Sequence, residues 1–188
     1  MLSTQSFRFS AVCGVLAGLL IAIPGLYDGL AGETALTSFL LGLSPAFAIP
    51  LAVALHLRQS HVQGGFGAVA YGVNMVGLGL FAGAVFTLNM AFYFLDDATV
   101  AMLRQGPTNT ALLLAGAVFA VGSVLFSVSL VRAKVFPTVP AWGYMSVVLL
   151  PVAARLPESP ATGAVHTVVG ATMVWLGIAL WTSLSRES

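Results

Sequence analysis

The side chains best suited to chemistry in this sequence are one histidine and several polar residues near the ends of apolar runs. His166 shares a helical face with Gly170 and Gly177, and a glycine-bearing face favours close helix contact, so its imidazole should point into the protein. A titratable group at that depth indicates a ligand pocket. The alternative is a histidine bonded to a backbone group or a carboxylate, with the acids solvated in loops. The pocket candidates expected at one depth are His166, Asn89, Tyr93, Asp28, Asp96 and Asp97.

No other cluster of residues supports a catalytic or metal-binding interpretation. His56 and His61 lie near each other at the end of a different apolar run, but no carboxylate or thiol accompanies them, so we expect no metal site. The sequence has a single cysteine, Cys13, and it carries no motif for nucleophilic catalysis or for cradling a phosphate. We therefore expect no cofactor and favour a non-enzymatic role.

The composition excludes most classes of soluble protein. Of the 188 residues, 59% are hydrophobic and 7% are charged, whereas soluble domains are about 45–50% apolar and about 25% charged. Thirteen charges cannot cover the surface of a soluble enzyme of this size, since there are 7 Lys+Arg and 6 Asp+Glu. A net charge of +1 provides no basic footprint for nucleic acid. The composition indicates an integral membrane protein.

The apolar runs predict an all-α, polytopic membrane protein, a single-domain bundle of six transmembrane helices. A transmembrane helix needs about 20 apolar residues, which the chain length allows about six times. The fifth run is short and is bounded by Pro137, Pro140 and Pro151, so it either spans the membrane or re-enters on the same side. The predicted helices in the domain 1–188 are 9–27, 35–57, 65–95, 110–131, 137–154 and 163–183.

Basic residues predict the orientation of these helices, because cytoplasmic loops carry an excess of lysine and arginine. With six spans, Arg104 and Arg155 fall on one side, and the other basic residues fall on the side of both termini. We therefore expect a multi-pass protein of the cell membrane with cytoplasmic N- and C-termini. The five basic residues on the terminal side are Arg8, Arg58, Arg132, Lys134 and Arg186.

Small residues recur at helical spacing in several runs and predict where helices pack closely. These stripes serve either packing within the chain or an interface with a second copy or another membrane protein. In the run 65–95, Gly72 and Asn74 lie on nearly opposite sides, which predicts that this helix is covered on both sides and lies centrally. The packing glycines are Gly14, Gly18, Gly72, Gly79, Gly83, Gly116, Gly170 and Gly177.

Two stretches of the second half carry a resemblance. They are residues 125–133, of sequence LFSVSLVRA and followed by Pro137, and residues 174–181, of sequence VWLGIALW. They resemble a group of small, uncharacterised six-helix membrane proteins of high-GC Gram-positive bacteria. The resemblance implies a membrane bundle, and it carries no activity and no site residue.

Three classes of function follow from these patterns. The leading prediction is a non-enzymatic accessory protein that binds membrane lipids or a partner, which exposed glycine faces would favour. A transporter or sensor with an outward-facing polar pocket would be favoured by a continuous polar path past Asn74 and Asn89. An enzyme acting on a lipid or isoprenoid would use Asp28, Asp96 or Asp97 as its acid, and would need these acids around an apolar pocket.

Overall fold

The computed structural model describes residues 3–185, and this part of the chain is helical and contains no strand. The prediction of an all-α protein is therefore confirmed. The elements are α1 (Thr4–Ala31), α2 (Ala35–Phe86), the π-helical turn η1 (Thr87–Ala91), the 3-10 turn η2 (Phe92–Phe94), α3 (Asp97–Leu103), α4 (Pro107–Ala133), α5 (Thr138–Gly143), the 3-10 segment η3 (Tyr144–Leu149), α6 (Leu150–Ala153) and α7 (Pro160–Ser185).

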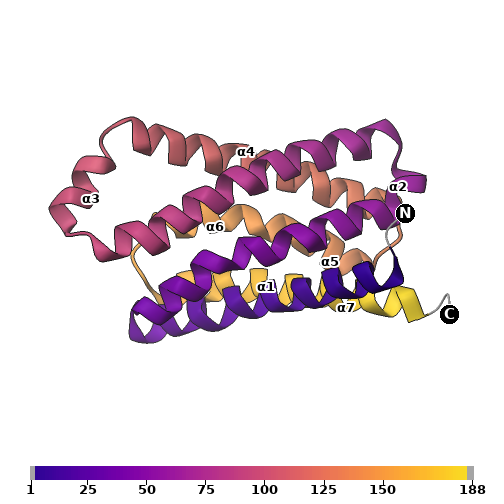
Figure 1. The fold of residues 1–188 in the computed structure, drawn as a ribbon, viewed down its shortest axis with the longest axis horizontal. Coiled ribbons are helices and arrows are strands. Elements are labelled where there is room, and N and C mark those ends of the chain that lie inside the picture. Colours follow the sequence, from indigo (N-terminus) through magenta and orange to yellow (C-terminus); the bar gives the residue numbers. More distant parts are fainter. Residues whose placement is uncertain (1–2, 186–188) are drawn as a thin grey trace.

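The long element α2 is two helical arms that fold back on each other at Gly64 (Figure 1). Gly64 has φ 60° and ψ −162°, a conformation that glycine adopts without steric cost. Residues of the two arms meet across the fold: the rings of His56 and Tyr71 stack with centroids 3.8 Å apart, and Gly42 faces Met90. With both arms counted, the described chain makes six helical runs, and the first arm continues six residues beyond its predicted end at position 57.

Four helical stretches are long and apolar enough to cross a membrane. This finding is compatible with the predicted membrane localisation. The four stretches are Thr4–Ala31, Ala35–Phe94 with its fold at Gly64, Pro107–Ala133 and Pro160–Ser185.

The fifth predicted helix, 137–154, is not one continuous α-helix. Its chain passes from α5 through the 3-10 segment η3 into α6, and the whole apolar stretch Thr138–Ala153 is shorter than the other candidate spans. Proline explains the break, since it removes a backbone donor and clashes with the preceding turn. Pro140 lies within α5, and Pro151 lies in the first turn of α6, where proline is tolerated.

Close glycine packing joins α1 to α7. A Cβ atom added to Gly18 would lie 2.8 Å from the backbone nitrogen of Val174, and one added to Gly170 would lie 2.6 Å from the Cβ of Ala22. Gly177 packs in the same way against α1, with the backbone nitrogen of Val15 at 2.9 Å. These backbones approach so closely because no side chain separates them, as is typical of helix pairs in lipid.

Other glycines pack α2 against its neighbours. Gly14 of α1 faces the side chain of Leu51, so the two glycines of the GxxxG motif, Gly14 and Gly18, contact different helices. The second arm of α2 meets α4 through Gly77, whose added Cβ would lie 2.6 Å from the Cα of Phe119. Gly116 of α4 has more room, with Pro151 Cβ at 3.1 Å.

The predicted packing face of the second arm of α2 is open. A Cβ atom added to Gly72, Gly79 or Gly83 meets nothing within 4 Å in the described chain, and all three glycines are exposed. The expectation that this helix is covered on both sides is therefore wrong. The side that carries Asn74 faces inward because a buried amide needs a partner, whereas a glycine face places no such demand on its surroundings.

Both ends of the described chain lie at the same end of the bundle (Figure 1). Several basic side chains make contacts at this end. The guanidinium of Arg8 lies 5.5 Å from the ring of Trp181, and Arg58 donates to the carbonyl of Ser183 at 3.2 Å. Arg132 belongs to the same end, since it lies in the last turn of α4 and its guanidinium lies 4.9 Å from the ring of Phe66. Because successive helices run in opposite directions, residues at the start of the first helix and at the end of each second helix lie at the same end of the bundle. Arg186, counted with them in the sequence, lies outside the described residues.

Candidate ligand cavity

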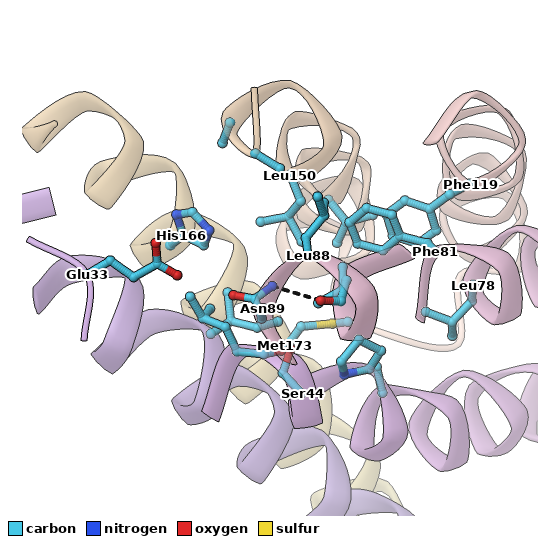
Figure 2. A pocket seen from close by; sticks show the side chains of 18 of the residues that line it. Glu33, Ser44, Leu78, Phe81, Leu88, Asn89, Phe119, Leu150, His166 and Met173 are labelled. Carbon is cyan, nitrogen blue, oxygen red and sulfur yellow. Dashed lines mark hydrogen bonds between the residues drawn. The ribbon is translucent and has the colours of Figure 1, made fainter. Parts of the chain in front are cut away.

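A cavity of about 170 Å³ is lined by residues from all the long helices (Figure 2). Its charged lining residues lie in the connections between helices at the end of the bundle away from the termini. The two arms of α2 form one wall, and α1, α4, α7 and the α5–α6 segment complete it. Figure 2 shows Glu33, His166 and Asn89 toward one side of this pocket and Leu78, Phe81 and Phe119 toward the other. The cavity therefore has a polar side and an apolar side.

The apolar side is closed by two stacked rings. Phe81 of α2 and Phe119 of α4 lie with centroids 4.2 Å apart and planes within 1° of parallel, and both are buried. Gly77 allows this stacking because its missing side chain lets the two helices touch beside it. Leu78 and Met173 extend the same surface. A ligand group placed here would contact hydrocarbon and aromatic faces only.

The polar side carries two carboxylates. Glu33 lies between α1 and α2 and accepts a hydrogen bond from the Ser38 hydroxyl. Glu158 precedes α7 and accepts from the Thr162 hydroxyl at 3.4 Å. Both acids are exposed at the mouth of the cavity. Arg104, the C-cap residue of α3, contributes one positive charge to the lining.

His166 lines the cavity from α7. Its Nδ1 lies 2.8 Å from the backbone oxygen of Thr162 and must donate to it, because a carbonyl only accepts. This bond leaves Nε2 for other partners. Gly25 of α1 makes room for the ring, since an added Cβ would overlap the Cβ and Cγ atoms of His166. The imidazole is thus bonded to its own helix, as the plainer sequence interpretation had it, and also lines a cavity.

Asn89 reaches the cavity because the helix changes type around it. It lies in the π-helical turn Thr87–Ala91, and its Nδ2 donates to the carbonyl of Val85 at 2.9 Å (Figure 2). Single π-turns inside helices occur often at functional sites.

Asp28 lies beside the cavity mouth but does not line it. The residue is only 2% exposed, and within the described chain neither carboxylate oxygen has a hydrogen-bond partner. The neighbouring Thr37 hydroxyl donates instead to a backbone carbonyl at the start of α2. Glu33, Glu158 and His166 lie within electrostatic range of the carboxylate. Asp28 therefore adds to the acidic character of this end of the bundle.

The remaining sequence candidates lie away from the cavity. Tyr93 packs edge-on against Phe94, with ring centroids 5.0 Å apart. Asp96 is the N-cap of α3 and accepts from the backbone nitrogen and the hydroxyl of Thr99; these bonds lower the pKa of its carboxyl. Asp97 is exposed in the first turn of α3. The structure therefore brings together His166 and Asn89, with Asp28 adjacent, and separates the other three.

Two charged lining residues were missed in the sequence, Glu33 and Arg104. Each lies in a short connection beside an apolar run at the same end as the chosen acids. That position could have placed both residues with the pocket candidates, since the ends of neighbouring helices lie at one depth. Glu158, in the connection before the last predicted helix, is a third lining residue outside the predicted set.

A second polar layer lies deeper in the bundle. The amide of Asn74 donates to the Tyr144 hydroxyl at 3.1 Å, and Ser123 lies 3.5 Å from the amide oxygen. Phe81 and Leu78 lie between this layer and Asn89 along the same helix. Within the described residues no group of three His, Cys, Asp or Glu side chains is placed to hold a metal ion.

Comparison of the chain with protein-family models, with curated proteins and with solved structures finds no match.

Proposed function

We propose that this protein is a non-enzymatic, membrane-embedded binding protein whose central cavity takes a small amphipathic cation. The observation that carries the proposal is the cavity itself, which combines an acidic mouth with a closed apolar floor at the convergence of the long helices. Ligand sites have this form, mostly apolar with a few polar groups that orient the ligand.

Charge supports a cationic ligand. Glu33 and Glu158 place two negative charges at the mouth against the single positive charge of Arg104, and Asp28 lies nearby. Aromatic faces attract cations as well, so a cationic group that enters more deeply still meets favourable surroundings at Phe81. An anionic ligand would face two carboxylates at the mouth of the cavity.

Size supports a small ligand. The cavity volume of about 170 Å³ is close to that of an apolar cavity of about 150 Å³ that accepts benzene. One aromatic or branched aliphatic group would fill the floor, and the charged group would then lie at the mouth.

The arrangement favours binding over transport or catalysis. The stacked rings of Phe81 and Phe119 interrupt the polar path between Asn89 and Asn74, and a transporter needs that path in some conformation. Of the three acids proposed for an enzyme, Asp96 and Asp97 lie away from the cavity, and Asp28 is buried beside its mouth without lining it. A second candidate role, as an accessory subunit for another membrane protein, is favoured by the open face at Gly72, Gly79 and Gly83.

The ligand proposal is tested with two probes of equal shape, benzyltrimethylammonium and neutral neopentylbenzene, titrated into detergent-solubilised protein by calorimetry. The cation should bind more tightly, and Glu33→Gln and Glu158→Gln should each weaken its binding by up to about fivefold, as for exposed ion pairs. Ala48, a buried residue of the first arm of α2, also lines the cavity. Ala48→Leu would fill part of the cavity and should weaken binding of both probes.

The control is Asp97→Asn, which removes an acid at the same end of the bundle but outside the cavity. It should leave binding of both probes unchanged. Equal binding of the two probes by the wild type, or an Asp97→Asn effect as large as that of Glu33→Gln, would contradict the proposal. Each variant is also checked for wild-type helix content by circular dichroism.

We further propose that the cavity opens to the cell exterior and that both termini are cytoplasmic. Four described basic residues, Arg8, Arg58, Arg132 and Lys134, lie toward the terminal end, against Arg104 and Arg155 at the cavity end. In a Cys13→Ser background, Asp97→Cys should react with a membrane-impermeant maleimide on intact cells. Ser60→Cys, exposed near the fold at Gly64, should react only after the cells are opened. The reverse pattern would refute this orientation.

A further inference from the structure

A second, larger hollow of about 500 Å³ lies between α4, the second arm of α2 and the η3–α6 segment. Its apolar lining along α4 runs from Leu112 to Ala120, eight helical steps, or about 12 Å at the helical rise of 1.5 Å per residue. Apart from the residues at one end, the lining is apolar. We call this hollow the α4–α6 groove.

Two arginines and an amide mark the end of the α4–α6 groove nearest the loops. Arg104 follows α3, and Asn109 lies in the first turn of α4. Arg155 follows α6 and donates from Nη2 to the Asn109 side-chain oxygen at 3.2 Å. Among the residues that the structure describes, no acid lines this groove. It therefore differs in charge from the central cavity, whose mouth carries Glu33 and Glu158.

The shape of the groove is set by small residues on α4. Gly116, Ala117 and Ala120 lie on the face that lines it, and longer side chains there would fill the hollow. Pro151 packs against Gly116, where an added Cβ would lie 3.1 Å from the Cβ of Pro151, so these two residues close one side of the groove and its open part lies beside them. A slot of this kind accepts a flexible hydrocarbon chain, which lies along the helix without needing polar partners.

We propose that the α4–α6 groove binds one phospholipid with an anionic headgroup, its phosphate held by Arg104 and Arg155 and one acyl chain lying along α4. Arginine pairs bind phosphate through several charge-assisted hydrogen bonds. Basic pockets between membrane helices select anionic headgroups in this way. A phospholipid requires two features together. Positive charge at one end binds its phosphate, and the apolar groove beside that charge holds its acyl chain.

This site is distinct from the central cavity, although the two share a wall. Phe81, Leu88 and Ala154 line both hollows, and Arg104 borders both. The acidic mouth of the central cavity repels a phosphate, and the α4–α6 groove provides no acid for a cation. Cation binding in the central cavity and lipid binding in the α4–α6 groove can therefore be confirmed or contradicted independently.

The test adds phosphatidylglycerol or phosphatidylcholine with identical acyl chains to detergent-solubilised full-length protein, and bound lipid is counted by native mass spectrometry. The wild type should retain one phosphatidylglycerol in preference to phosphatidylcholine. Arg104→Gln and Arg155→Gln should each lower that preference by about fivefold, the effect expected of one arginine near an anionic headgroup. Arg155→Lys, which keeps the charge, should retain most of it.

Matched variants separate the groove from general lipid adhesion. Ala117→Phe fills the groove and should remove retention of both lipids, whereas Ala111→Phe adds the same bulk on an exposed part of α4 outside the groove and should change nothing. Lys134→Gln removes a positive charge from the other end of α4 and should also have no effect.

Three results would overturn the proposal. They are equal retention of the two lipids by the wild type, unchanged preference in both arginine variants, and a protein dimer that holds no lipid and is lost in Ala117→Phe. The last result would assign the groove to a second copy of the chain.

Discussion

Replacing Gly18 or Gly170 by alanine is expected to lower the free energy of unfolding by about 1–3 kcal/mol, the usual cost of overpacking a close contact. A Cβ atom on Gly18 would overlap the carbonyl oxygen of Gly170, and it would lie 2.7 Å from Val174 Cγ2. The oxygen belongs to the backbone of α7, so it cannot rotate away as a side chain would. The two helices must separate, and each contact along their shared face then weakens.

The measurement is unfolding of the detergent-solubilised protein by SDS, followed by far-ultraviolet circular dichroism. Gly79→Ala is the matched control, because Gly79 is also a helical glycine but an added Cβ meets nothing within 4 Å. Alanine favours a helix over glycine by up to about 1 kcal/mol, so Gly79→Ala should be neutral or slightly stabilising. If Gly18→Ala were as stable as Gly79→Ala, α1 and α7 would not pack as described.

The second large effect is expected at the buried polar layer. Asn74 and Tyr144 are both almost fully buried, and their side chains exchange hydrogen bonds at 3.1 and 3.3 Å. Asn74→Ala leaves the Tyr144 hydroxyl without this partner, and a buried unpaired polar group costs about 1–3 kcal/mol. Asn74 also packs tightly on α4, where an added Cβ on Gly122 would lie 2.6 Å from its Cα. We expect Asn74→Ala to lower the free energy of unfolding by about 1–3 kcal/mol.

A double-mutant cycle isolates the hydrogen bonds from the packing. Asn74→Ala combined with Tyr144→Phe should be less destabilising than the sum of the two single changes, by about 0.6–1.7 kcal/mol, the range measured for bonds between membrane helices. Asn89→Ala is the control for losing an amide, because Asn89 donates only to the carbonyl of Val85 in its own helix. Strict additivity of the two changes would mean that Asn74 and Tyr144 do not interact.

Most of the helical architecture follows from local properties of the sequence, namely the length of its apolar runs and the residues that interrupt them. Long apolar runs separated by charged or glycine-rich connections predict helices and their number, and the structure confirms an all-helical chain with four stretches long enough to cross a membrane. The predicted helices 35–57 and 65–95 leave a break between them, and the chain folds back within it at Gly64. The prolines of 137–154 left open whether this run spans or re-enters the membrane; the structure makes it α5, η3 and α6 in succession.

The direction of polar side chains inside apolar helices could also be predicted from the sequence, because burying a polar group without a partner is costly in any helix. That cost turns Asn74 inward, toward Tyr144 and Ser123. It likewise turns His166 toward the cavity and ties its Nδ1 to the Thr162 carbonyl. For such residues the direction follows from the residue type, and only the partner has to be found.

The sequence did not predict which glycines contact another helix or which acids line the cavity. Both depend on how the helices pack together. These helices are apolar on nearly every side, so no amphipathic pattern separates the side that meets protein from the side that meets lipid. Glycine is tolerated on both, which is why Gly170 packs and Gly79 does not. Glu33 and Glu158 are far apart in sequence and meet at one cavity only because α1, α2 and α7 end at the same level. Which residues of different helices meet depends on how far each helix is shifted along its neighbours. Packing of the whole bundle sets that shift, and the sequence of a single helix does not.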